Sequence, residues 1–139
     1  MTHYALVSVG SNIEPQKNVK KCRQILSAET SLLGESSFIE TDPVGYQDQP
    51  MFLNGTFYLA TDLDYDDFNH YLKQVERRLG RIKGAEKSGP RVMDLDIIVW
   101  NGLVVHDDYY TQDYVIQPLQ ELVEKLGLNI SVPEARDNN

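Results

Sequence analysis

The sequence predicts an α+β fold in which one mostly antiparallel sheet carries helices on one face. Three observations lead to this prediction. Short runs rich in β-branched and aromatic residues are typical of strands. Two longer segments repeat apolar residues every three or four positions, which is the period of an amphipathic helix. These segments follow one another in the order strand, helix, strand, strand, helix, strand, so both kinds of element can share one core.

The first half of the chain is expected to hold a strand, a helix and a second strand. Tyr4–Ser8 reads as the first strand, closed by Gly10-Ser11-Asn12. Pro15 suits the first turn of a helix. The apolar stripe of this helix consists of Val19, Cys22 and Leu26. A Gly-Glu-Ser-Ser turn is expected after Leu32-Leu33, followed by an extended segment over Phe38–Thr41.

The second half repeats the pattern with a longer strand, a helix and another strand. Phe52–Thr61 is rich in aromatic and β-branched residues, and Asp64 is a suitable cap for the helix that follows. The stripe of that helix consists of Phe68, Leu72, Val75 and Leu79. Gly80 is expected to end the helix. Val92–Trp100 then forms the most clearly marked strand in the chain.

A hairpin and a short helix are predicted after these elements. Asn101-Gly102 is a hairpin turn signal, with Leu103–Val105 as the returning strand. Pro118–Leu126 reads as a last short helix that stops at Gly127. The strand and helix order is that of the ferredoxin-like βαββαβ sandwich, with the hairpin and the C-terminal helix appended. We expect a single domain over residues 1–132 and a loose polar tail over 133–139.

Composition excludes several classes of protein. The chain has 139 residues, of which 41% are hydrophobic, and its formal net charge is −8. One domain of this size forms a sufficient core without disulfides or metals. The negative charge argues against a nucleic-acid-binding protein. Because Cys22 is the single cysteine and no leader or membrane-spanning segment is recognisable, we expect a cytoplasmic protein.

Two aspartates stand two residues apart in the Val92–Trp100 strand. Asp94 and Asp96 should project from the same face, while Met93, Leu95, Ile97 and Val99 form the apolar face opposite. Adjacent carboxylates repel each other unless a cation lies between them, and an all-oxygen ligand set favours Mg²⁺ over Zn²⁺. The alternative is a pair of solvated aspartates on an exposed face, and by itself the motif slightly favours that alternative.

A basic, glycine-containing segment precedes these aspartates. It carries six cationic residues, namely Arg77, Arg78, Arg81, Lys83, Lys87 and Arg91. Arg77 and Arg78 are explained by the helix end, where cations are favourable. For Arg81, Lys83 and Arg91 we favour a functional role, because cations beside a carboxylate-held Mg²⁺ can neutralise a polyphosphate.

A third motif combines two turns with the start of a strand. Thr41-Asp42-Pro43-Val44-Gly45 is followed by Asp48-Gln49-Pro50, and Phe52 and Asn54 then share one strand face. A planar heterocycle could stack on Phe52 and hydrogen-bond to the amide of Asn54. By itself, however, this pair is better explained as a core phenylalanine and a strand-start asparagine.

Together the three motifs resemble the 6-hydroxymethyl-7,8-dihydropterin pyrophosphokinase family of folate biosynthesis. The resemblance runs from about Tyr4 to Leu126, and its most specific part is Gly89-Pro90-Arg91 followed by Asp94-Leu95-Asp96. The further matches are Val9 to Asn12, Thr41 to Gly45, Asp48 to Pro50, Phe52 to Asn54, Glu76, Leu79 to Arg81, and Pro118-Leu119.

The resemblance implies a ferredoxin-like fold and the Mg²⁺-dependent transfer of pyrophosphate from ATP to the pterin, giving AMP. Asp94 and Asp96 would bind two Mg²⁺ ions, and Arg81 and Arg91 would contact phosphates as catalytic residues. The implied nucleotide-binding residues are Glu76, Arg81, Lys83 and Arg91. The implied pterin-binding residues are Thr41, Val44, Gly45, Phe52, Asn54 and Tyr114. The implied partners are the pterin and ATP, with neither nucleic acid nor membrane, and a monomer is expected.

The sequence also departs from the family pattern near the expected ATP site. Lys83 replaces an arginine, and Ser88 replaces a tryptophan. About eight residues are missing between Tyr110 and Tyr114, with the family's histidine and arginine, and His106 is interpreted as lying outside that register. An alternative function is therefore a weak or inactive relative that binds a pterin or nucleotide. A purely structural domain would leave the paired aspartates and the basic segment unexplained.

Overall fold

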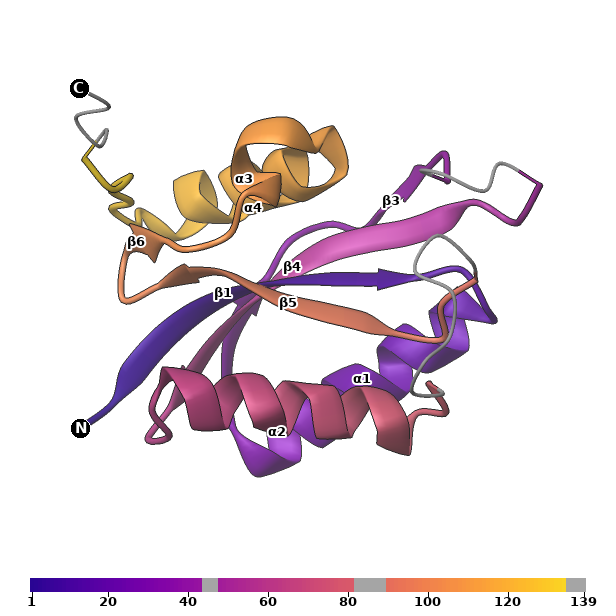
Figure 1. Ribbon diagram of the computed structural model, residues 1–139, viewed down its shortest axis with the longest axis horizontal. Coiled ribbons are helices and arrows are strands. Elements are labelled where there is room, and N and C mark those ends of the chain that lie inside the picture. Colours follow the sequence, from indigo (N-terminus) through magenta and orange to yellow (C-terminus); the bar gives the residue numbers. More distant parts are fainter. Residues whose placement is uncertain (44–47, 82–89, 135–139) are drawn as a thin grey trace, which may run out of the picture.

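The structure, a computed structural model, describes residues 1–43, 48–81 and 90–134. In this part of the chain six strands form one sheet, and helices cover both of its faces (Figure 1). None of the helices in these ranges is both long and apolar enough to cross a bilayer. The predicted positions Val44, Gly45 and Lys83 lie outside the described residues, as do Ser88 and most of the predicted tail.

The elements follow one another along the chain with short connections. They are β1 (His3–Ser11), α1 (Pro15–Glu29), β2 (Ser31–Glu35), β3 (Ile39–Thr41), β4 (Phe52–Thr61), α2 (Tyr65–Arg78), β5 (Asp94–Trp100), β6 (Leu103–Val104), α3 (Asp108–Thr111) and α4 (Asp113–Leu126). The strand order in the sheet is β2-β4-β1-β5-β6, and β3 pairs with β4. All ladders between these strands are antiparallel. The predicted α+β class and its antiparallel sheet are confirmed.

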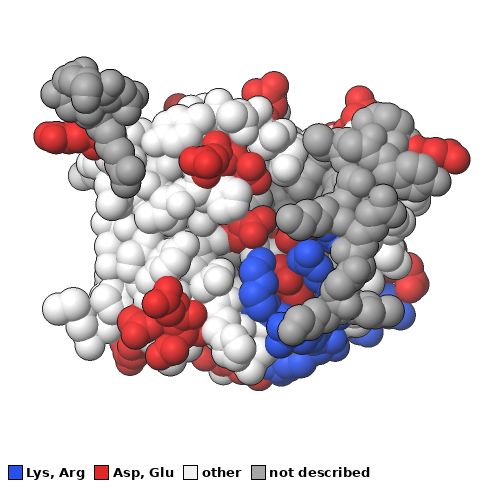
Figure 2. Space-filling view, in the orientation of Figure 1, with Lys and Arg blue, Asp and Glu red and all other residues white. Residues whose placement is uncertain are grey.

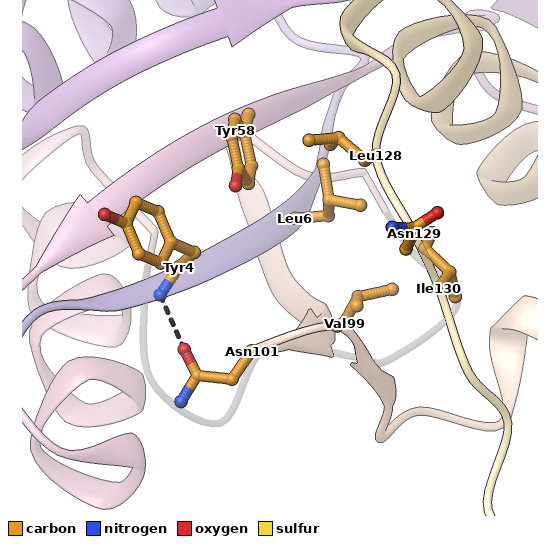
Figure 3. A pocket seen from close by; sticks show the side chains of 9 residues that line it. Tyr4, Leu6, Tyr58, Val99, Asn101, Leu128, Asn129 and Ile130 are labelled. Carbon is orange, nitrogen blue, oxygen red and sulfur yellow. Dashed lines mark hydrogen bonds between the residues drawn. The ribbon is translucent and has the colours of Figure 1, made fainter.

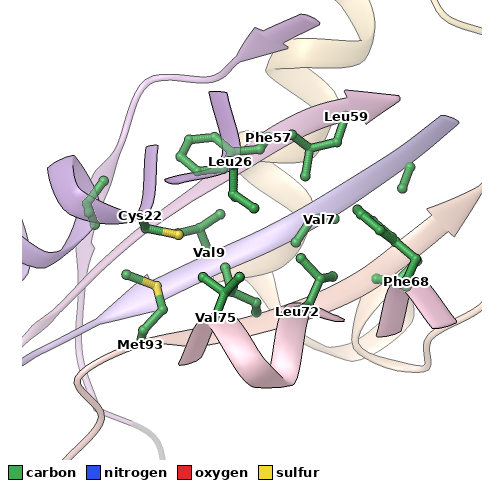
Figure 4. Close-up of a cluster of buried hydrophobic side chains, with 14 residues drawn as sticks. Val7, Val9, Cys22, Leu26, Phe57, Leu59, Phe68, Leu72, Val75 and Met93 are labelled. Carbon is green, nitrogen blue, oxygen red and sulfur yellow. The ribbon is translucent and has the colours of Figure 1, made fainter. Parts of the chain in front are cut away.

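Helices cover both faces of the sheet, so the prediction that they lie on one face is wrong. α1 and α2 cover one face and α3 and α4 the other (Figure 1). β1 shows why, because Ala5, Val7 and Val9 contact the α1–α2 side while Leu6 belongs to the α4 side. A strand that is apolar at consecutive positions must be buried on both faces. Figure 4 shows the larger core, in which Val7 and Val9 meet side chains of both helices.

The regular alternation of β5 ends at Val99. The pairing of β1 with β5 shifts by one residue between Leu6 and Val7, where a bulge interrupts the ladder. Ile98 and Val99 therefore both belong to the core on the α4 side, although the period-two pattern assigned Val99 to the other face. A bulge inserts one residue into a ladder and changes the direction of the side chains that follow.

Two predicted boundaries in the first half differ from the structure because pairing with β4 extends the strands. β1 continues through Gly10 and Ser11, which pair with Asn54 and Leu53. The first half of the turn expected after Leu32-Leu33, Gly34 and Glu35, is instead part of β2, which pairs with β4 across a register shift before Gly34. Ladder hydrogen bonds outweigh the local turn preference of glycine and serine here.

The C-terminal helix begins earlier than predicted. α4 starts at Asp113, so Pro118 lies inside the helix, and the short α3 before it was not predicted. Proline is common in the first turn of a helix, which is why the sequence placed the start there. The buried face of α4 consists of Val115, Pro118, Leu119 and Leu122. Burial of this face against the sheet outweighs the cost of an internal proline.

Several local signals are confirmed. β4 has the predicted bounds, and Asp64 caps α2 by accepting a hydrogen bond from the backbone N–H of Asp67 at 2.8 Å. Asn101 and Gly102 both have positive φ, as the tight hairpin turn requires. Gly127 ends α4 in the left-handed conformation. These features depend on neighbouring residues only, which makes them accessible from sequence.

Gly55 provides a test of how the Phe38 ring packs against β4. A Cβ added there would lie 2.7 Å from three ring atoms of Phe38, whose ring packs edge-on against Phe57. Gly55→Ala is expected to lower the free energy of unfolding by about 1–3 kcal/mol in urea titrations. Gly34→Ala is the control, because its Cβ would meet the flexible end of Leu126 at 2.9 Å. Equal losses in both variants would contradict this account.

Candidate active site

The two aspartates predicted as metal ligands lie at the start of β5. Pairing with β1 places Asp94 opposite Gly10 and Asp96 opposite Ser8. Alternate residues of a strand project to the same face, so the two carboxylates are neighbours. Their side chains are 40% and 30% exposed, respectively. Both carboxylates are therefore held by the sheet and are still accessible to a ligand.

The edge of β5 at this position is covered by side chains of α2. Among the described residues, β6 pairs with β5 only at Val99 and Trp100, so Leu95 has no strand beside it on that edge. The backbone N–H of Leu95 donates to Glu76 Oε2 at 2.6 Å, and its carbonyl accepts from Lys73 Nζ at 2.6 Å. These two side chains take the place of a neighbouring strand and fix α2 relative to the aspartates.

Lys73 of α2 and Arg81, which follows that helix, supply one cation to each aspartate. Glu76 is 3% exposed and accepts from Lys73 Nζ at 3.1 Å and from Arg81 Nη1 at 2.9 Å. Lys73 Nζ also lies 3.3 Å from Asp96 Oδ1, and Arg81 Nη1 lies 3.0 Å from Asp94 Oδ1. Among the described residues, three carboxylates thus share the two cations Lys73 and Arg81. Figure 2 shows basic and acidic side chains gathered near the centre of this face.

Burial and mutual repulsion make the ionised form of Asp94 unfavourable. Burial, followed by the negative charge of Asp96, raises the pKa of Asp94 despite the nearby Lys73 and Arg81. Burial also raises the pKa of Glu76. For Lys73, burial acts to lower the pKa, but Asp96 and Glu76 outweigh it and raise the pKa. A further cation bound beside Asp94 would favour its ionised form.

Asp94→Asn is expected to stabilise the metal-free protein at neutral pH. Because the folded protein holds the Asp94 proton more tightly than the unfolded chain, ionisation lowers stability as the pH rises above the ordinary pKa of 3.8. The variant should melt at a higher temperature than the wild type at pH 7, and at the same temperature at acidic pH, where the wild-type carboxyl is protonated. Thermal melts monitored by circular dichroism at both pH values test this. A lower melting temperature at pH 7 would contradict it.

Arg91 is held in place through its backbone by Asn12, which follows β1. Asn12 N–H donates to the Arg91 carbonyl at 3.0 Å, and Arg91 N–H donates to Asn12 Oδ1 at 2.8 Å. Asn12 Nδ2 also donates to Gln49 Oε1 at 2.8 Å and to the Pro50 carbonyl at 3.0 Å. One buried asparagine therefore joins three segments that the sequence motifs contain. Arg91 itself is 6% exposed.

The residues predicted to bind a heterocycle meet where β1, β3 and β4 adjoin. Asn54 Nδ2 donates to Thr41 Oγ1, and Thr41 pairs with Phe52 in the ladder. An added Cβ at Gly10 would lie 2.7 Å from Asn54 Oδ1 and 3.9 Å from the Phe52 ring. Glycine is needed there because the two strands and the buried amide approach closely. Since Gly10 also pairs with Asp94, this group adjoins the carboxylates.

Tyr114 of α4 lies close enough to the carboxylates to be affected by their charge. Burial first, and then the charges of Asp108, Asp94 and Asp96, raise the pKa of Tyr114 to about 12. Its ring is part buried, and its hydroxyl is held protonated by this negative environment. The structure thus brings most of the described predicted residues into one region, on β3, β4, β5, α2 and α4.

Sequence reasoning missed two side chains of this region. Lys73 was not considered, although it touches both Glu76 and Asp96. His106 was interpreted only as lying outside the register of the family's histidine, and the structure shows that its ring, Asp96 and Asp108 offer ligand atoms within 4.8 Å of one another. Spacing along α2 could have indicated Lys73, because residues three apart share a helix face. Nothing in the spacing of His106 predicted its position.

A separate cavity lies on the α4 side at the opposite end of β1 (Figure 3). Its volume is about 280 Å³, and Tyr4 and Tyr58 line it with their rings stacked 6.0 Å apart. Asn101 lies at its rim, where its Oδ1 accepts a hydrogen bond from the Tyr4 N–H at 2.9 Å. None of the residues that line this cavity carries a charge. The charged group on β5 is therefore the better candidate active site.

Comparison with known proteins agrees with the motifs. The sequence profile described as "7,8-dihydro-6-hydroxymethylpterin-pyrophosphokinase (HPPK)" matches residues 6–124. The chain is similar to the 2-amino-4-hydroxy-6-hydroxymethyldihydropteridine pyrophosphokinases of Bacillus subtilis and Haemophilus influenzae. The Bacillus subtilis protein is 32% identical, and the alignment covers 91% of this chain and 81% of that protein. The Haemophilus influenzae protein is 29% identical, and the alignment covers 89% of this chain and 84% of that protein.

A longer relative matches in the same way over part of its length. The folic acid synthesis protein FOL1 of Dictyostelium discoideum is 30% identical over 84% of this chain, and the match covers 19% of that protein. The profile match over residues 6–124 includes the two aspartates, the end of β1 and the Thr41–Asn54 region.

Proposed function

Because the chain belongs to the 7,8-dihydro-6-hydroxymethylpterin-pyrophosphokinase family, we propose that it transfers pyrophosphate from ATP to 6-hydroxymethyl-7,8-dihydropterin in folate synthesis, leaving AMP. The observation that carries the proposal is the Asp94–Asp96 pair with Lys73 and Arg81 beside it. An acidic pair flanked by fixed cations is the arrangement that a metal-bound polyphosphate needs. The similarity to named pyrophosphokinases over most of the chain supports the same assignment.

The donor set of the site fits magnesium. Asp94 and Asp96 offer carboxylate oxygens, which Mg²⁺ prefers, and their part exposure leaves room for the waters that this ion retains. We propose that these two residues hold the two ions that the family resemblance implies. When bound, magnesium would neutralise charge on the phosphates of ATP and polarise their oxygens.

The chain's own residues would position the two substrates. Arg81 and Arg91 are proposed to contact phosphates, with Lys83 assigned to the same role from sequence. Glu76 holds Arg81 and Lys73 in place, and so fixes the cations before ATP binds. Such preorganised charge costs no rearrangement during the reaction.

The pterin is proposed to bind beside the carboxylates. Phe52 and Tyr114 offer ring faces, and the amide of Asn54, held by Thr41, offers hydrogen bonds to the heterocycle. Val44 and Gly45 are assigned to this site from sequence. Placing the hydroxymethyl oxygen in line with the β-phosphorus would convert a bimolecular reaction into one within a single complex.

The test is AMP formation by the purified protein with ATP, Mg²⁺ and 6-hydroxymethyl-7,8-dihydropterin. AMP that requires both the pterin and magnesium would support the proposal, and an Asp94→Ala/Asp96→Ala variant should form none above background. Binding of the pterin by fluorescence without AMP formation would favour the alternative, a non-catalytic binding protein. That alternative is favoured by Lys83, by Ser88 and by the shortened segment before Tyr114.

Two further assignments remain proposals. We propose that residues 1–132 form one domain that acts as a monomer on small molecules. We also propose that the protein is located in the reducing cytoplasm. This proposal is supported by Cys22, which is a free cysteine. This cysteine is buried in the core, and burial raises its pKa to about 12, which suits an unreactive structural thiol.

A further inference from the structure

We propose that Asp96, His106 and Asp108 form a binding site for a transition-metal ion of the Zn²⁺ or Co²⁺ type. The site has a different ligand set from the proposed magnesium pair and overlaps it at one carboxylate, Asp96. It does not depend on the transfer reaction, because the three ligands are present in the free protein.

The three residues come from different parts of the α4 side of the sheet. Asp96 belongs to β5, His106 to the segment after β6, and Asp108 to the first turn of α3. One ligand atom of each lies within 4.8 Å of the other two, and all three side chains are part buried. A small closure of these side chains would bring them to coordination distance, and part exposure gives the ion access.

The distance between two of the ligands already suits one ion. His106 Nδ1 and Asp108 Oδ2 are 3.7 Å apart. Two ligands at about 2.1 Å from a common ion and 3.7 Å from each other subtend an angle of about 120°, which is close to tetrahedral geometry.

The Nδ1 atom of His106 carries the lone pair that would bind the ion. The backbone N–H of Asp108 donates to His106 Nδ1 at 3.0 Å, so in the neutral ring the proton is on Nε2. An ion would take over the Nδ1 lone pair. The N–H of Asp108 belongs to the first turn of a short helix at the surface, where water can replace its acceptor.

Asp96 has a carboxylate oxygen that can ligate the ion. In the described ranges, its ion pair with Lys73 uses Oδ1 at 3.3 Å, which leaves Oδ2 for the metal. If the two cations repel each other, Lys73 Nζ can give up its 3.3 Å contact with Asp96. Glu76 and the Leu95 carbonyl retain Lys73 in that case.

The ligand atoms of the two proposed sites favour different kinds of metal ion. An imidazole nitrogen with two carboxylates favours Zn²⁺ or Co²⁺ over Mg²⁺, whereas the Asp94–Asp96 pair offers oxygen alone. Three protein ligands leave at least one coordination position for water or an anionic ligand. A transition ion bound here would also engage Asp96 and so compete with one magnesium ion.

The experiment titrates Co²⁺ into the purified full chain without ATP, pterin or Mg²⁺, and follows the visible absorption bands of the bound ion. Zn²⁺ should displace the Co²⁺, and calorimetry should give one Zn²⁺ per chain. His106→Asn and Asp108→Asn are each expected to weaken Zn²⁺ binding by at least about tenfold, since even the loss of a residue that orients a ligand commonly has that effect.

Matched controls are available in the same chain. His70 is exposed on α2 beside Gln74, and Asp107 is adjacent to the site without belonging to it. His70→Asn and Asp107→Asn should bind Zn²⁺ like the wild type, and circular dichroism should show that all four variants are folded. Unchanged Zn²⁺ affinity in folded His106→Asn would overturn the proposal, and so would an equal loss in His70→Asn.

The outcome is separable from that of the proposed function. Zn²⁺ binding through His106 in a protein that forms no AMP would retain the metal site and remove the enzyme assignment. AMP formation with unchanged Zn²⁺ affinity in His106→Asn would retain the enzyme assignment and remove the transition-metal site.

Discussion

Asp96→Asn is expected to reduce the rate of AMP formation by about 10²–10³-fold, the size of effect seen when one group that stabilises transition-state charge is removed. The substitution keeps the size of the side chain and removes the charge that would hold magnesium. Asp96 is part exposed, and its ion pair among the described residues is with Lys73, so the fold should persist. The measurement is AMP release at saturating ATP and pterin over a range of Mg²⁺ concentrations.

The control for this prediction is Asp66→Asn, on the exposed first turn of α2. That variant carries the same chemical change away from the site and should keep the wild-type rate. High Mg²⁺ should restore part of the activity of Asp96→Asn if Asp94 still binds an ion. A turnover close to that of the wild type at low Mg²⁺ would show that Asp96 is not a ligand in the reaction.

Glu76→Ala is expected to lower the free energy of unfolding by about 2–4 kcal/mol and to abolish most activity. Glu76 is 3% exposed and is the acceptor for the Leu95 N–H at the edge of β5. Alanine would leave this N–H buried without an acceptor, and would release Lys73 and Arg81 from the positions in which they face the aspartates. Urea denaturation followed by the fluorescence of the single tryptophan, Trp100, measures the loss.

Glu76→Gln is the matched variant that separates shape from charge. Because burial raises the pKa of Glu76, its negative charge contributes little to stability, and glutamine retains an oxygen acceptor for Leu95. The glutamine NH2 cannot accept from Arg81, so Arg81 must turn away from it and keep Asp94 as its partner, while Lys73 keeps the amide oxygen and Asp96. We therefore expect a loss below about 1 kcal/mol for glutamine. Equal losses for alanine and glutamine would show that the ion pairs, rather than the β5 edge contact, maintain the structure.

Much of the fold could be predicted because its signals are local. β4 was predicted with its bounds, and Asp64, Gly127 and the Asn101-Gly102 turn act as predicted. Each depends on backbone preferences within a few residues. β2 and the start of α4 could not be predicted, because pairing with β4 and burial against the sheet outweighed the local preferences of Gly34 and Pro118.

The sequence by itself determined that the two aspartates are neighbours, since residues two apart on a strand share a face. It also determined the family resemblance, because the motifs keep their order along most of the chain. Only the tertiary structure decided which cations meet these carboxylates. Lys73 reaches Asp96 because α2 covers the edge of β5, and His106 reaches it because a short hairpin returns the chain to the α4 side. Such contacts depend on how distant segments pack, and no local pattern encodes that packing.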